Sequence, residues 1–183
     1  MKPVVMFFVG VTLLLAGCAK PVNQKLVSTT PATPQQFSEA KSAASVCGRH
    51  APNWVAASTA LKAKGYTETK NARLASIQRA QRAVILENSG TDVIVLLGSR
   101  GDEGACFVGL AGMTPQQSFE LAQPWVKKFD ARTNAERGQG LAKNAVQAWG
   151  TLEEKRIVYV AAYKTWDVLD APGAAVRLLY IQR

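Results

Sequence analysis

The sequence predicts an α+β fold, an antiparallel sheet of about five or six strands with helices packed mainly on one face. Three observations lead to this prediction. Helix-start signals stand early in the chain and again near its middle, β-rich segments fill the gaps, and helices and strands do not alternate regularly. Regular alternation would be expected of a doubly wound parallel sheet, so that class is not predicted.

Two helix starts share a short motif, TPQQFSEA from Thr33 and TPQQSFEL from Thr114. Each places threonine at the N-cap, proline at N1 and glutamine at N3, which is a variant of the capping box. The apolar residues that follow each start recur at helical spacing and predict one buried face per helix. They are Phe37, Ala40, Ala44 and Cys47 after the first start, and Phe119, Ala122, Val126 and Phe129 after the second.

Glycine and proline mark where the helices should end or bend. The first helix is expected to end at Gly48 and Pro52, and Pro124 should kink the helix after Thr114 or cost stability. Asn53 is expected to cap another helix, with Gly65 as its left-handed stop. The apolar stripe of that helix consists of Trp54, Ala57 and Leu61.

Strands are predicted from β-rich runs bounded by turn residues. Ser89 and Gly90 separate the first two runs and indicate a hairpin. The strand segments are AVILEN (83–88), TDVIVLLG (91–98), about Ala105 to Leu110, KRIVYVAAYK (155–164) and AAVRLLYIQR (174–183). Two segments stay open. NAVQAW (144–149) is a short strand or a helical turn, and residues 72–83 have helical spacing but a β-rich end.

Residues 1–17 predict a signal peptide. Lys2 precedes an apolar run from Val4 to Ala16, which is shorter than the roughly 20 residues of a membrane-spanning helix. The run ends in Leu15-Ala16-Gly17-Cys18, which resembles the lipobox of bacterial lipoprotein precursors. The resemblance implies cleavage before Cys18, a diacylglyceryl group on its sulfur and acylation of the new amine. The alternative is an ordinary secretory leader beside a chance cysteine.

The residues after the leader predict a tether. Residues 18–32 contain prolines and small polar side chains but few large apolar ones, so we expect a lipid-anchored flexible linker. Several acyl chains on one cysteine would hold the protein almost permanently, since each buried CH₂ contributes about 0.8 kcal/mol. We therefore expect a cell-envelope protein that faces the periplasm from the outer or the inner membrane. Ala19, in place of an aspartate, resembles the default outer-membrane case of enteric bacterial lipoproteins. Residues 33–183 suffice for a single globular domain.

The two remaining cysteines, Cys47 and Cys106, predict a disulfide bond. With Cys18 assigned to lipid, they are the only pair left in an exported and therefore oxidising compartment. The alternative is two buried free thiols. A catalytic cysteine is not expected, because pairing would consume the nucleophile.

No catalytic residue, cofactor or metal site is predicted. His50 is the only histidine, and near the end of the first helix its expected role is a favourable interaction with the helix dipole. Neither G-x-S-x-G nor HExxH occurs. An envelope hydrolase with a carboxylate-based site remains the alternative, although the paired acids lie mostly in turn-like segments. These pairs are Asp102 with Glu103, Glu153 with Glu154, and Asp167 with Asp170.

Positive charge gives the first functional indication. The chain has 22 Lys and Arg against 13 Asp and Glu. One stretch contains six basic residues and a single acid, Glu68, and it is a candidate contact for anionic envelope polymers or lipid headgroups. The six are Lys62, Lys64, Lys70, Arg73, Arg79 and Arg82. The alternative is a solvated basic face. Nucleic acid is not expected as a partner outside the cytoplasm, and aromatic residues are not interleaved as a stacking platform requires.

The second indication is YKTWDVLDAPGAA, where Tyr163 and Trp166 precede a Pro-Gly break. An exposed tryptophan there would suit a loop that docks another envelope protein, because Trp is common at binding hot spots. The alternative is that the rings cover the edge of the core. The sequence thus predicts a membrane-anchored envelope lipoprotein that acts as a non-enzymatic binding or assembly module.

Overall fold

The structure is a computed structural model that describes residues 30–81, 83–100, 103–133, 145–153, 155–166 and 169–180. Its helices are α1 (Pro34–His50), α2 (Trp54–Ala63), α3 (Ala72–Gln81) and α4 (Pro115–Lys128). Its strands are β1 (Thr67–Glu68), β2 (Ala83–Asn88), β3 (Val93–Arg100), β4 (Glu103–Leu110), β5 (Arg132–Thr133), β6 (Ala145–Glu153), β7 (Arg156–Trp166) and β8 (Ala171–Tyr180). The predicted leader and the linker as far as residue 29, Cys18 included, lie outside the described residues.

The strands form one antiparallel sheet in the order β1-β2-β3-β4-β8-β7-β6-β5. The predicted α+β class is confirmed. The predicted number of five or six strands was too low for the described chain, because the two-residue strands β1 and β5 add to the two edges. Five of the six longer strands overlap the five predicted segments, and the open segment before Gly150 lies in the sixth, β6.

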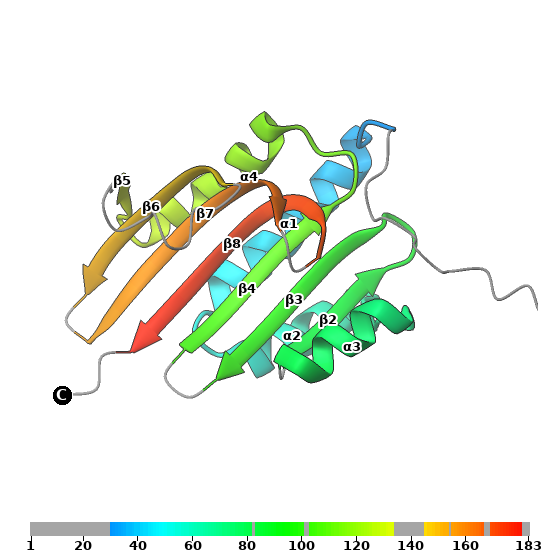
Figure 1. The fold of residues 1–183 in the computed structure, drawn as a ribbon, viewed down its shortest axis with the longest axis horizontal. Coiled ribbons are helices and arrows are strands. Elements are labelled where there is room, and N and C mark those ends of the chain that lie inside the picture. Colours follow the sequence, from blue (N-terminus) through cyan, green and yellow to red (C-terminus); the bar gives the residue numbers. More distant parts are fainter. Residues whose placement is uncertain are drawn as a thin grey trace, which may run out of the picture.

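Helices lie on both faces of the sheet, but unequally (Figure 1). One face, here called the helical face, is covered by α1, α2 and α4, and the larger core lies between these helices and the strands. The opposite face, here called the front face, carries α3 over β2. The ambiguous segment after residue 72 is therefore a helix followed by a strand, with Leu74 buried against the front face. Helices lie mainly on one face, as predicted, and α3 is the exception.

The predicted helix caps are present. Thr33 Oγ1 accepts a hydrogen bond from the backbone N–H of Gln36 at 3.2 Å, and Gln36 Oε1 accepts one from Thr33 N–H at 2.9 Å. Thr114 forms the same reciprocal pair with Gln117. Gly65 has φ +90, the left-handed conformation expected of a helix stop. Interactions between residues close in the chain therefore determine where α1 and α4 begin and where α2 ends.

Gly48 does not end α1, which continues to His50. It is buried where α1 meets α4, and a Cβ at this position would lie 2.9 Å from Cδ1 of Trp125. The indole N–H of Trp125 donates to the carbonyl of Ala44 at 2.9 Å. Gly48 is therefore a packing residue whose missing side chain makes room for an indole.

The apolar face of α4 is centred differently from the prediction. Its buried residues are Ser118, Leu121, Ala122 and Trp125, whereas Phe119 and Val126 are only partly buried. Pro124 is exposed on the opposite side, and the helix continues through it to Lys128. The tertiary partners of α4 thus select a face slightly rotated from the predicted one.

The start of the domain is fixed to the turn after β4. Ala32 N–H donates to the carbonyl of Gly112 at 3.0 Å. Gly112 has φ +81, and a Cβ there would overlap the carbonyl oxygen of Thr30, so only glycine allows this approach. The chain therefore enters the domain at one defined end of the sheet, where β4 ends and α4 begins.

Candidate functional site

Cys47 of α1 and Cys106 of β4 form a disulfide bond with a Cα–Cα distance of 6.3 Å. Both residues are fully buried in the core of the helical face. The predicted pairing is present, and it joins the first helix to the centre of the sheet. Because both sulfurs are bonded, neither cysteine is a nucleophile here.

The front face over β6, β7 and β8 carries exposed apolar side chains and is the candidate binding surface. Strand register places its residues in rows across the three strands. The first row is Leu152, Ile157 and Leu179, the second is Gly150, Tyr159 and Arg177, and the third is Ala148, Ala161 and Ala175. The residues between these rows along each strand, such as Val158 and Val160, point to the other side of the sheet and belong to the core of the helical face.

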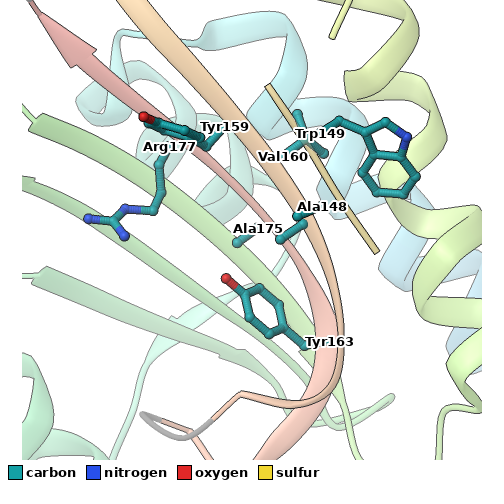
Figure 2. A pocket seen from close by; sticks show the side chains of 8 residues that line it. Ala148, Trp149, Tyr159, Val160, Tyr163, Ala175 and Arg177 are labelled. Carbon is teal, nitrogen blue, oxygen red and sulfur yellow. The ribbon is translucent and has the colours of Figure 1, made fainter. Parts of the chain in front are cut away.

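A small hollow lies over the alanine row (Figure 2). Tyr159 and Arg177 border it on one side, and the hydroxyl of Tyr163 points toward the alanines from the other. Its volume is about 10 Å³, which is room for roughly one water molecule. The alanines and Tyr163 are almost completely buried at 4–5% exposure, with the exception of Ala148. This hollow is therefore part of a packed surface and not a pocket for a small molecule.

The first row is far more exposed. Leu152 is 57% exposed and Leu179 is 38% exposed, while Ile157 between them is half-buried. The neighbouring Tyr159 and Arg177 are half-buried, like Ile157. We call Leu152, Ile157 and Leu179 the apolar strip. It lies at the end of the sheet where β4 begins, because Leu179 is paired with Glu103.

The two residues of the predicted partner loop lie within a cluster of aromatic rings. Tyr163 is 4% exposed and belongs to the smaller core on the front face. Trp166 is half-buried and packs against Phe107 with a ring-centroid distance of 4.2 Å. Tyr163 is therefore a core residue and not an exposed anchor, and Trp166 covers the edge of the core.

The basic stretch is mostly exposed. Lys62 forms an ion pair with Glu68 at 2.7 Å, whereas Arg82 lies outside the described residues. Lys62 is exposed, and so are Lys64, Lys70, Arg73 and Arg79. Lys70 lines the same groove as Asn88 and Asp92, at the end of the sheet where β2 finishes and the chain enters. Gln78 of α3 bonds to Ile85 and α3 ends beside the start of β2, so Arg73 also lies toward the chain-entry end. Arg79 lies near the other end of α3.

The hydrolase alternative requires paired carboxylates, and one member of each predicted pair lies outside the described residues, namely Asp102, Glu154 and Asp167. An open groove of about 440 Å³ includes Glu68, Glu87 and Asp92 in its lining. Register places Glu87 on the front face, while Glu68 points toward Lys62 of α2 on the helical face. The two strand carboxylates therefore diverge.

Neither a metal-binding cluster nor a membrane-spanning helix occurs in the described part of the chain. His50 is half-buried near the end of α1, as predicted, and no group of three or more His, Cys, Asp or Glu side chains that could hold a metal ion occurs there. Across the same residues, none of the helices combines the length and the apolar character needed to span a membrane. Comparison with protein-family models, with curated proteins and with solved structures gives no match for this chain.

Sequence reasoning missed the apolar strip. Its three residues come from two hairpin arms and from a strand near the end of the domain, and none stands out in its own segment. Strands β7 and β8 are mostly buried on both faces, so their sequences do not alternate between apolar and polar residues and mark no single face. A row of exposed residues is recognised only when the pairing of the strands is known.

Proposed function

We propose that this chain is a non-enzymatic binding or assembly module of the bacterial cell envelope, held at a membrane by lipid on Cys18. The observation that carries the binding role is the front face over β6 to β8. Leucine side chains there are substantially exposed beside Tyr159 and Arg177. Exposed apolar side chains grouped with tyrosine and arginine are typical of protein-binding surfaces.

The anchoring role is supported by the lipobox resemblance and by the place where the chain enters the domain. Thr30 to Ala32 are held against Gly112, at the end of the sheet where β4 finishes. The twelve residues from Ala19 to Thr30 span at most about 43 Å. A lipid on Cys18 would therefore hold the domain near the membrane, with this end leading.

Charge supports the same orientation. Lys64, Lys70 and Arg73 lie exposed toward the chain-entry end. Basic residues near an anionic leaflet gain about 1 kcal/mol each when they approach the surface. An anionic membrane or envelope polymer would thus attract the end of the domain that the tether brings close.

The anchor is tested by intact-mass analysis of the protein purified from envelopes. The expected species begins at Cys18 and carries acyl groups, and Cys18→Ser should instead accumulate as an uncut precursor without them. A matched variant, Thr29→Ser, changes the linker without touching the cysteine and should be processed normally. A wild-type protein that is cut elsewhere, or that carries no acyl group, would contradict the proposal.

The binding role is tested in living cells with a photo-reactive amino acid at Tyr159, on the front face. A matched control position is Thr59, which is exposed on α2 on the other side of the molecule. We expect one discrete cross-linked species from Tyr159 and none from Thr59. Equal labelling from both positions would indicate random collision and would remove the support for a binding face.

A further inference from the structure

We propose that the exported chain, while still unfolded, is the substrate of a protein dithiol oxidase of the periplasm, which joins Cys47 to Cys106 before α1 packs on the sheet. The inference rests on the proposed function, because it requires export to an oxidising compartment. Oxidation of this pair of thiols would then precede folding. In the folded domain, the bond would be out of reach of oxidants and reductants.

The folded domain encloses both cysteines. Cys47 and Cys106 are each 0% exposed. Cys106 lies in β4 near the middle of the sheet, where it is paired with Leu97 of β3 and Val176 of β8. These two partners are also buried and belong to the same core. The bond therefore lies in the interior of the larger core.

Helix α1 covers the bond, and it packs against both α2 and α4 on the helical face (Figure 1). An indole ring from each of these neighbours lies close to one of the cysteines. Trp54 of α2 packs over Gly104, two residues before Cys106 on the same face of β4. Trp125 of α4 packs against Gly48, the residue that follows the cysteine of α1. Both indoles are nearly buried, so packed side chains flank the bond on both sides of α1.

Thiol–disulfide exchange needs direct access to a sulfur atom, because a thiolate attacks one sulfur of a disulfide and forms a mixed disulfide. In the proposed reaction, one cysteine thiolate of this chain attacks the disulfide of the oxidase and releases one oxidase thiol. The other cysteine thiolate then attacks the mixed disulfide, which forms the Cys47–Cys106 bond and releases the second oxidase thiol. The chain gives up two electrons and two protons, and the oxidase disulfide takes them up to become a dithiol.

The mixed disulfide cannot form inside the folded domain. It would place a sulfur atom of another protein within bonding distance of a fully buried side chain, where α1 packs on β4. Protein interiors are close-packed, so this space is already filled. The oxidase must therefore act while α1 is still separated from the sheet.

Timing favours an enzyme over a small oxidant. Small domains fold in microseconds to seconds, whereas disulfide formation takes seconds to hours, depending on the oxidant. If folding came first, α1 would enclose the two thiols in their reduced form. A protein oxidase that acts on the chain as it is exported can form the bond before this happens.

The first test measures how readily the native bond is reduced. Mature protein purified from envelopes in detergent is treated with dithiothreitol, and the free thiols are counted by mass after maleimide labelling. We expect reduction to be at least about a hundredfold slower than in the same protein unfolded in concentrated urea, because attack on the bond requires a rare opening of the domain. Similar rates under the two conditions would overturn the proposal.

Matched variants on α1 show whether this helix is the cover. Gly48→Ala places a Cβ 2.9 Å from Cδ1 of Trp125, so α1 can no longer pack as closely against α4. We expect reduction of its bond to be about tenfold faster than in the wild type, the effect of a typical overpacking cost. Ser45→Ala changes an exposed residue of the same helix and should leave the rate unchanged. Equal rates in all three proteins would show that α1 does not enclose the bond.

The second test follows newly exported chains in cells with and without the periplasmic oxidase. We expect the bond to form early in the first case and the thiols to stay reduced in the second. Cys106→Ser should trap Cys47 in a mixed disulfide with an oxidase whose own resolving cysteine is replaced by alanine. Cys47→Ala/Cys106→Ala is the matched control and should give no adduct. Oxidation at an unchanged rate without the oxidase, or no adduct from Cys106→Ser, would overturn the proposal.

Failure of this proposal and failure of the proposed anchor give different results. If Cys18 carries no acyl group but the native bond resists reduction and forms only with the oxidase, the anchor fails and oxidation before folding stands. If Cys18 is acylated but the native bond is reduced as fast as in urea, the anchor stands and oxidation before folding fails.

Discussion

Gly104 shows how one absent side chain positions an element. It faces the helical side of β4, and a Cβ at this position would overlap Nε1 of Trp54, the first residue of α2. The indole is nearly buried, so it has little room to move. The close contact of α2 with β4 therefore depends on glycine at this position.

We predict that Gly104→Ala destabilises the domain by about 1–3 kcal/mol, the usual cost of overpacking a core. The measurement is the midpoint of urea unfolding, followed by tryptophan fluorescence. The matched control is Gly150→Ala in β6, where a Cβ would have no neighbour closer than 3.7 Å. Equal midpoints for the two variants would show that α2 is not held by this contact.

Tyr66 is a buried hydroxyl with one clear partner. Its O–H donates to Glu39 Oε1 of α1 at 2.9 Å, and the residue is 2% exposed. The pKa of Tyr66 is raised far above its ordinary value, chiefly by burial. The hydrogen bond to Glu39 and the negative charge of Glu39 raise it further. The folded protein therefore keeps the Tyr66 proton at pH values where the unfolded chain releases it.

This shift predicts a loss of stability at high pH. Above pH about 10, the unfolded state binds fewer protons than the folded state, so the free energy of unfolding falls as pH rises. Tyr66→Phe should unfold more easily near pH 7, because the hydrogen bond to Glu39 is lost. Its free energy of unfolding should also decline less steeply above pH 10. Parallel pH curves for the two proteins would contradict this account.

At the scale of elements, the disulfide is the strongest connection between the first helix and the sheet. It joins residues separated by 59 positions. Closing a loop of this length removes chain entropy from the unfolded state equivalent to about 4 kcal/mol. The helical face is therefore held by a covalent bond at its centre as well as by apolar contacts.

We predict that Cys47→Ala/Cys106→Ala lowers the free energy of unfolding by about 2–4 kcal/mol. Reductant should lower the urea midpoint of the wild type and leave that of the double variant unchanged. Thiol labelling of the unfolded, unreduced domain should find neither cysteine free. Complete labelling of both would show that the bond does not form in the protein as isolated.

At the scale of the whole molecule, the two ends of the sheet differ in character. Exposed cations lie at the end where the chain enters, on α2, on α3 and on the two loops that connect these helices to β1. The other end carries the apolar strip. A domain that is tethered at its basic end would present its apolar end outward.

We predict that the lipid-free domain from Thr30 onward binds anionic vesicles at low salt. Binding should weaken steeply as salt rises, because exposed charges are screened beyond about 8 Å at physiological ionic strength. Lys70→Gln/Arg73→Gln/Arg79→Gln should reduce binding without unfolding the domain, since all three side chains are exposed. The matched control is Lys41→Gln/Arg49→Gln/Lys127→Gln, which removes three exposed cations from α1 and α4. An equal loss in both variants would indicate net charge, and no loss in either would indicate a solvated face.

Local chemistry is what the sequence by itself determined. The caps at Thr33 and Thr114 and the left-handed Gly65 depend on neighbours within a few residues, so their motifs could be recognised in the chain. The pairing of Cys47 with Cys106 followed by elimination. The β-rich runs indicated strands, since β-branched and apolar residues favour extended backbone.

Only the tertiary structure decided which residues share a surface. Strand β8 inserts between β4 and β7, and this pairing aligns Leu152, Ile157 and Leu179 in one row although no local pattern connects them. Gly48 likewise matches a helix stop in the sequence, whereas in the fold it packs against Trp125. In both cases the partner comes from far along the chain. Long-range register and packing, which depend on the whole fold, therefore determined the candidate binding surface.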